Sequence, residues 1–231
     1  MDYEQFITEI RKYWDLRDRG LKKQANRFLF EFTGRFKADV SRNESDNILF
    51  RFCREYIDEG KFPDCNLPFQ ITELLSHYLI EECEKDKMPQ MRWAFQIFGK
   101  HLNLHAPDCG QSPYNILERA YAHEQCDQQT VNLYFGEQVD YLWRGQHHFP
   151  EGCLIERSEF EETVHTAKRI LAEKHVEPSL VTEFDYYVKL YGIYFEWRDN
   201  GRNGDFYELC RNAGLEYREL PTFSYKTCKV V

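Results

Sequence analysis

The chain has 231 residues, of which 42% are hydrophobic and 30% are charged, and its formal net charge is −9. No segment holds the ~20 consecutive apolar residues of a membrane span, and the first residues mix acidic with apolar side chains, unlike a signal peptide. These totals argue against a membrane-spanning or secreted chain. They predict a cytoplasmic protein in which the eight cysteines are free thiols.

Aromatic residues make up 16% of the chain and recur at helical spacing, which predicts many packed helices. The first helix is expected over residues 3–18, and the second over residues 21–32, where Gly34 closes it. A third begins at an N-cap, Ser45, and ends at Gly60. Further helices are expected over residues 71–83, 91–98, 116–121, 131–143, 160–171, 178–197 and 206–210. The last segment, 214–231, lacks helical periodicity.

These elements predict an all-α fold of about nine or ten helices in antiparallel pairs, joined by Pro- and Gly-containing turns. Residues 1–231 are expected to form a single helical domain. The longest interruption of the pattern, at residues 145–152, is the place where the domain would divide.

Two segments have the residue pattern of a helical repeat, namely ILERAYAHEQCDQQTVNLYF (116–135) and LLSHYLIEECEKDKMPQMRWAFQIF (74–98). In each, a helix with a small residue and an aromatic near its end passes through a short polar loop into the next helix. Residues 71–145 thereby resemble degenerate tetratricopeptide-type repeats. The resemblance implies a stack of antiparallel helix pairs, as in a short α-solenoid.

An acidic run ends the helix over residues 71–83 and consists of Glu81, Glu82, Glu84 and Asp86. Negative charge at a helix C-terminus opposes the helix dipole and costs up to ~1 kcal/mol per charge. Such a cost suggests another use for the run. It is a candidate contact for a basic partner, and the alternative is that it only aids solubility.

The long helix over residues 178–197 has two apolar faces. The second face contains Tyr186, Leu190, Ile193 and Trp197. Either this helix is covered on both sides by its own helical stack, or its second face binds a partner or a second copy of the chain. Tyr186 and Trp197 are therefore candidate partner-binding residues.

Residues 61–200 contain 23 acidic and 13 basic residues, whereas residues 1–60 contain 12 of each. An acidic surface repels the phosphates of nucleic acids and attracts basic proteins. No nucleic-acid partner is expected. A basic protein partner is expected, although the charge could also serve solubility alone.

The sequence has no complete catalytic or metal-binding motif. Glu162 and His165 have the spacing of a di-iron ligand pair but lack the second pair such sites need. His101 and His105 are four residues apart, with Asp108 and Cys109 nearby, but Pro107 places the second half in a loop and the sequence has no H-E-x-x-H motif. We therefore predict no catalytic residue, no cofactor and no metal.

The leading hypothesis is a non-enzymatic protein-binding module, in its most concrete form an immunity-like or antitoxin-like protein whose acidic surface occludes a basic toxin. One alternative is a helical enzyme or small-molecule binder with a buried pocket of aromatic and His side chains. Another is a regulatory scaffold that binds a peptide through its tetratricopeptide-like part.

Overall fold

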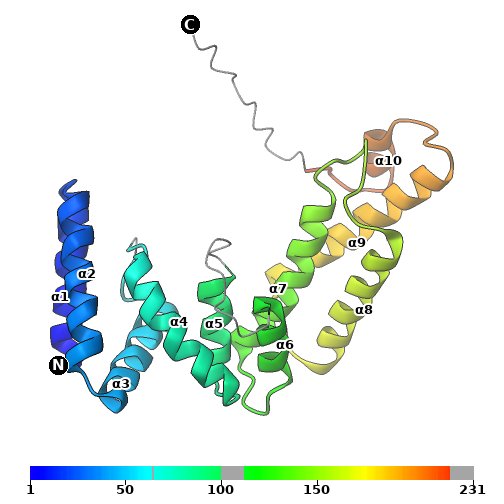
Figure 1. Cartoon of the computed structure of the whole chain (residues 1–231). Coiled ribbons are helices and arrows are strands. Elements are labelled where there is room, and N and C mark those ends of the chain that lie inside the picture. The colour runs from blue at the N-terminus through cyan, green and yellow to red at the C-terminus, as the bar shows by residue number, and fades with distance from the viewer. Residues whose placement is uncertain (64, 100–111, 219–231) are drawn as a thin grey trace, which may run out of the picture. The chain divides into compact units, whose positions relative to one another are not determined.

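The computed structural model describes residues 1–63, 65–99 and 112–218 (Figure 1). The regular elements within these residues are ten α-helices and one π-helical turn, which confirms the all-α prediction. The helices are α1 (Tyr3–Asp18), α2 (Lys22–Asp39), α3 (Arg42–Cys53), α4 (Phe69–Glu84), α5 (Gln90–Phe98), α6 (Pro113–Ala122), α7 (Gln128–Gly145), α8 (Arg157–Glu173), α9 (Pro178–Asp199) and α10 (Phe206–Asn212). The π-helical turn, η1 (Arg54–Asp58), directly follows α3.

Internal contacts divide the chain into two compact units, Met1–Cys126 (unit 1) and Asp127–Val231 (unit 2). The sequence-based boundary at 145–152 instead lies within unit 2, in the connection between α7 and α8. Phe149 of this connection is buried, and its ring stacks on Tyr194 of α9 with a centroid distance of 4.0 Å. The break in periodicity is therefore a packed loop, not a linker.

In unit 1, α1 packs on α2, α4 packs on α5, and α5 packs on α6. Phe6 of α1 lies at the centre of the aromatic core and is fully buried. Its ring centroid is 5.7 Å from Phe32, 5.2 Å from Phe36 and 5.7 Å from Phe52. These contacts join α1 and α2 to α3, because aromatic rings at 4.5–7 Å attract one another beyond the area they bury.

Two helix ends in unit 1 differ from the sequence-based prediction. Gly20 adopts the left-handed backbone that ends a helix (φ 77°), whereas Gly34 does not, and α2 continues to Asp39. The buried Phe36 extends the apolar stripe through this added turn. The N-cap of α3 is Ser41, not Ser45, because the Glu44 side chain accepts hydrogen bonds from the Ser41 backbone N–H (3.2 Å) and hydroxyl (2.7 Å).

The π-helical turn η1 orients two carboxylates toward neighbouring helices. Glu55 accepts a hydrogen bond of 2.9 Å from the hydroxyl of Tyr3 in α1. Asp58 accepts two hydrogen bonds from Arg92 of α5, at 2.7 and 3.2 Å, and another from the Trp93 indole at 3.0 Å. The Arg92 side chain is only 3% exposed, so this paired carboxylate satisfies a buried charge.

In unit 2, α9 is the central helix, with α7 and α10 packed against it and α8 packed on α7. The ring of Phe160 in α8 stacks on Tyr191 of α9 at 5.0 Å. The Tyr191 hydroxyl donates a hydrogen bond of 2.8 Å to the Leu142 carbonyl oxygen in α7. A stacked ring and a buried hydrogen bond thus fix α9 between α7 and α8.

Candidate binding surfaces

The acidic run at the end of α4 is largely paired within unit 1. Glu81 forms an ion pair with Arg42 at the start of α3, and Glu82 pairs with Lys85 at 2.7 Å. Glu84 is exposed, and no ion pair to it occurs in the part of the chain that the structure describes. The sequence shows that these acids lie close together along the chain, but it could not show which basic side chains pair with them.

Arg119 of α6 binds the C-terminal end of α4. Its guanidinium forms an ion pair with Asp86 and donates a hydrogen bond of 2.6 Å to the Cys83 carbonyl oxygen. The hydrogen bond from Arg119 lowers the pKa of the Asp86 carboxyl. A cation at the helix C-terminus offsets the unfavourable interaction with the helix dipole. The cost expected from sequence is therefore compensated within unit 1 and does not by itself require a partner.

The second apolar face of α9 is covered within unit 2. Tyr186 is 8% exposed, its hydroxyl accepts a hydrogen bond of 3.0 Å from the Arg218 backbone N–H, and the Arg218 guanidinium lies 4.1 Å from its ring centroid. Trp197 is partly buried, with its ring 5.3 Å from Phe206 of α10 and its indole N–H donating to the Gly204 carbonyl oxygen at 3.1 Å. These contacts favour a helix packed on both faces within its own unit over a face reserved for a partner.

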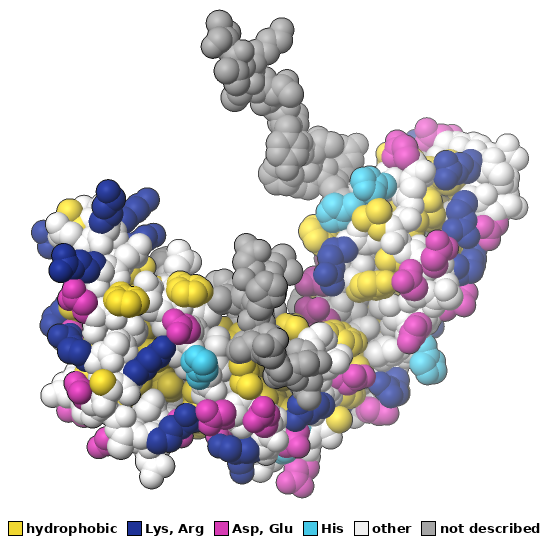
Figure 2. All heavy atoms as spheres, viewed as in Figure 1, with side chains coloured by type: hydrophobic (Ala, Val, Ile, Leu, Met, Phe, Trp, Pro, Cys, Tyr) yellow, Lys and Arg dark blue, Asp and Glu magenta, His cyan; other side chains and the backbone are white. Residues whose placement is uncertain are grey.

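Exposed aromatic side chains occur instead on α2 and α4. Phe30 is 72% exposed and Phe69 is 62% exposed, the two highest values among large hydrophobic residues in the described ranges. The sequence carried a signal for Phe30, because it lies off the apolar stripe of its helix. Figure 2 shows hydrophobic side chains on the face over α2 and α4, beside Lys and Arg side chains of the α1–α2 hairpin. Exposed aromatic residues on one face are typical of a contact surface.

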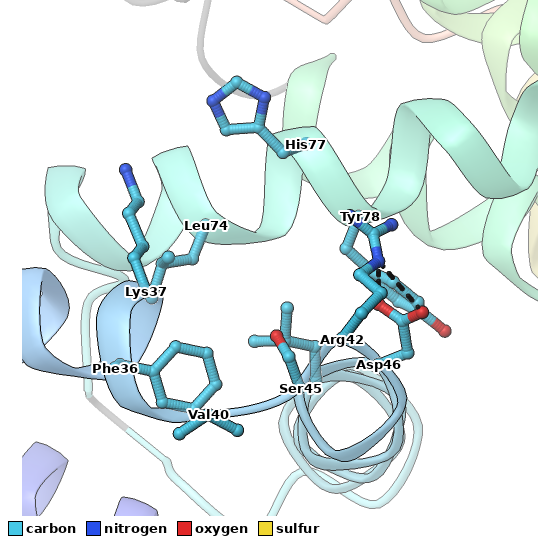
Figure 3. Close-up of a pocket in the computed structure, with 10 residues that line it drawn as sticks. Phe36, Lys37, Val40, Arg42, Ser45, Asp46, Leu74, His77 and Tyr78 are labelled. Atoms are coloured by element: carbon cyan, nitrogen blue, oxygen red, sulfur yellow. Dashed lines mark hydrogen bonds and ion pairs between the residues drawn. The ribbon is translucent and has the colours of Figure 1, made fainter.

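A groove of about 420 Å³ lies between α2, α3 and α4. Its apolar lining comes from buried side chains, and Lys37, Arg42, Asp46 and His77 lie around its rim (Figure 3). The apolar lining residues are Phe36, Val40, Leu49, Leu74 and Tyr78. Arg42 pairs with Asp46 at 3.1 Å, and Lys37 pairs with Glu73 of α4 at 3.0 Å. The groove therefore combines an apolar floor with a charged rim, as ligand and peptide sites do.

The start of α8 has three exposed carboxylates without an ion-pair partner among the described residues. Glu156, Glu161 and Glu162 are exposed, and no lysine or arginine among the described residues pairs with them. Glu156 is the N-cap of α8, and its backbone N–H donates a hydrogen bond of 2.6 Å to the Glu159 side chain. Glu161 and Glu162 follow in the second turn of α8, where their side chains face solvent.

The described residues contain no group of three or more potential metal ligands. Glu162 and His165 are both exposed on α8. His101 and His105 lie outside the described residues, so the structure does not bear on their spacing. Among the described cysteines, Cys53, Cys153 and Cys210 are free thiols.

No family model, curated protein or solved structure matches the chain. None of the described helices has the length and apolar character needed to cross a membrane.

Proposed function

We propose that the chain is a non-enzymatic protein-binding module that binds a basic protein through its acidic surface. The observation that carries this proposal is the set of exposed carboxylates at the start of α8, Glu156, Glu161 and Glu162, which have no counter-ion among the described residues. Burial of such charges against an apolar partner would be costly, whereas a basic surface would pair with them. An immunity-like or antitoxin-like protein that covers a basic toxin is the most concrete version.

The distribution of charge supports the same partner class. Residues 127–231 contain 18 acidic and 12 basic residues. A field of one sign raises the association rate of oppositely charged proteins and disfavours nucleic acids. The acidic run on α4 contributes less, because three of its four carboxylates have partners in unit 1.

The test begins with affinity capture from the native host at low and moderate salt, followed by association kinetics with the captured protein. In the variant Glu161→Lys with Glu162→Lys, we expect the association rate to fall about ten-fold and its salt dependence to flatten. Both residues lie beyond the first turn of α8, so the loss of dipole stabilisation is small.

The matched control is Asp15→Lys with Asp18→Lys, which changes the net charge equally at the exposed end of α1. An equal loss in both variants would mean that only the net charge matters. An unchanged rate in the α8 variant would contradict the proposal, since these carboxylates would then serve solubility alone.

A further inference from the structure

Helix α2 presents a cationic row on its exposed side. At 100° per residue, Lys23, Arg27 and Lys37 fall on one face together with Phe30 and Gly34, and all five are exposed. Arg27 pairs with Glu31 at 3.0 Å, and no ion pair to Lys23 occurs among the described residues. From Lys23 to Lys37 the row is about 21 Å long, or four helical turns.

Helix α4 presents an anionic row on its outer face. Glu73 and Glu84 share its outer face with Phe69 and His77. The ion pair between Lys37 and Glu73 shows that the two rows meet at this point. Figure 1 shows α2 and α4 running in the same direction, and in Figure 3 the side chains of Lys37 and His77 point the same way, away from the groove floor.

The face between the two rows has two places for apolar side chains. One is the groove of about 420 Å³ beside Lys37, whose apolar lining residues are buried. The other is the exposed surface of α2 at Phe30, next to Gly34, where a Cβ would meet open space, while the outer face of α4 carries the exposed Phe69. Phe30 precedes Lys37 by seven residues, which is about 10 Å along the helix. Two apolar side chains seven residues apart on a bound helix would reach both places.

We propose that the face between α2 and α4 binds an amphipathic helix of a protein partner. The apolar stripe of that helix lies over the groove and the Phe30–Phe69 edge, its acidic flank faces Lys23, Arg27 and Lys37, and its basic flank faces Glu73 and Glu84. Charge complementarity determines this choice of occupant, because a helix with flanks of one sign would meet like charges on one side. The inference rests on the proposed function and names a second contact surface for the partner.

The test uses synthetic helical peptides of about 20 residues, about 30 Å long, and measures fluorescence anisotropy with the full chain. The first peptide has a Leu/Phe stripe with glutamates on one flank and lysines on the other. Two further peptides keep the stripe but have only glutamates or only lysines on both flanks. We expect the mixed peptide to bind about five-fold or more tightly than either single-sign peptide, because only it avoids like-charge contacts.

The variants Phe30→Ser and Gly34→Gln should each weaken binding of the mixed peptide by about ten-fold or more, because one removes an apolar anchor and the other places a side chain on the surface that Gly34 leaves open. Gly34→Gln should also raise the melting temperature, since glutamine has a higher helix propensity than glycine. Loss of binding in this variant is thus not a loss of folding. Gly192→Gln on α9, where a Cβ likewise has no atom within 4 Å, is the matched control and should leave binding unchanged.

Two results would overturn the proposal. The first is a mixed peptide that binds no better than the single-sign peptides or binds the Phe30 and Gly34 variants as well as the wild type. The second is a concentration-dependent dimer in analytical ultracentrifugation that Phe30→Ser abolishes, which would assign this face to a second copy of the chain. The charge reversals on α8 do not alter α2 or α4, so failure here leaves the proposed function standing if those reversals still slow association.

Discussion

Three glycines inside helices differ in their surroundings, two being open and one crowded. Substitutions at them should therefore change the stability of the fold in opposite directions. A Cβ at Gly34 or Gly192 would have no atom within 4 Å, whereas one at Gly145 would overlap the Tyr191 hydroxyl and lie 2.9 Å from Cγ1 of Ile155. We expect Gly34→Ala and Gly192→Ala each to raise the free energy of unfolding by about 0.5–1 kcal/mol, because alanine is the better helix former.

Gly145→Ala should instead lower the free energy of unfolding by about 1–3 kcal/mol, since it displaces a buried hydroxyl from its hydrogen bond to the Leu142 carbonyl. Urea titrations followed by circular dichroism measure all three variants. A gain of stability for Gly145→Ala would show that α7 and α9 are less closely packed than described.

Glu137 of α7 should make the stability of the fold depend on pH. Burial raises the pKa of its carboxyl above the ordinary value, and the nearby Asp140 raises it further, while Arg144 opposes the shift. A raised pKa in the folded state means that the ionised carboxylate destabilises the fold as the pH rises through that pKa. Glu137→Gln should therefore raise the melting temperature at pH 7.

This gain should disappear below about pH 4.3, the ordinary pKa of glutamate, where the wild-type carboxyl is protonated in both states. Thermal melts of the two proteins between pH 4 and pH 8 measure the difference. Glu161→Gln on the exposed side of α8 is the control and should have little effect at either pH. An equal gain at pH 4 and pH 7 would contradict ionisation as its cause.

At the scale of elements, α10 covers α9 mainly through Phe206. This side chain is 2% exposed, and its ring lies 5.3 Å from Trp197 and 6.0 Å from both Phe149 and Tyr194. Phe206→Ala should lower the free energy of unfolding by about 3–5 kcal/mol and shift the Trp197 emission to longer wavelength as water reaches the indole. Leu209→Ala, at a side chain 36% exposed on the same helix, should do neither. An unshifted spectrum would mean that α10 does not shield this face.

The sequence predicted elements with a strong apolar period and missed features that depend on residues distant in the chain. The predicted first helix has the bounds of α1, because its stripe and Gly20 agree. The end of α2 was predicted too early, because a glycine such as Gly34 often terminates a helix. Only the burial of Phe36 shows that the helix continues.

The candidate surfaces show the same limit. Glu81 and its partner Arg42 are 39 residues apart, so no local pattern could reveal that the acidic run is paired. Likewise, Arg218 and Tyr186 are 32 residues apart, and only their contact explains how the second face of α9 is covered. The exposed Phe30 could have been identified from its position off the stripe, but the packing of its helix against α4 could not.

At the scale of the whole molecule, each unit has a core of its own. The buried cluster around Phe6 consists of residues between Tyr3 and Ala120, and the aromatic cluster around Tyr191 and Tyr194 belongs to unit 2. Local unfolding proceeds in contiguous cooperative units that share a core. A core substitution should therefore destabilise the unit that contains it more than the other.

Leu190→Ala and Leu75→Ala provide a matched pair for this prediction, because both side chains are fully buried, one in α9 of unit 2 and the other in α4 of unit 1. Each should cost about 2–5 kcal/mol. Native-state hydrogen exchange read by mass spectrometry should show lost protection in α7–α10 for Leu190→Ala and in α1–α6 for Leu75→Ala. If either variant loses protection equally in both units, the chain unfolds as one cooperative domain, and the division after Cys126 describes contacts but not stability.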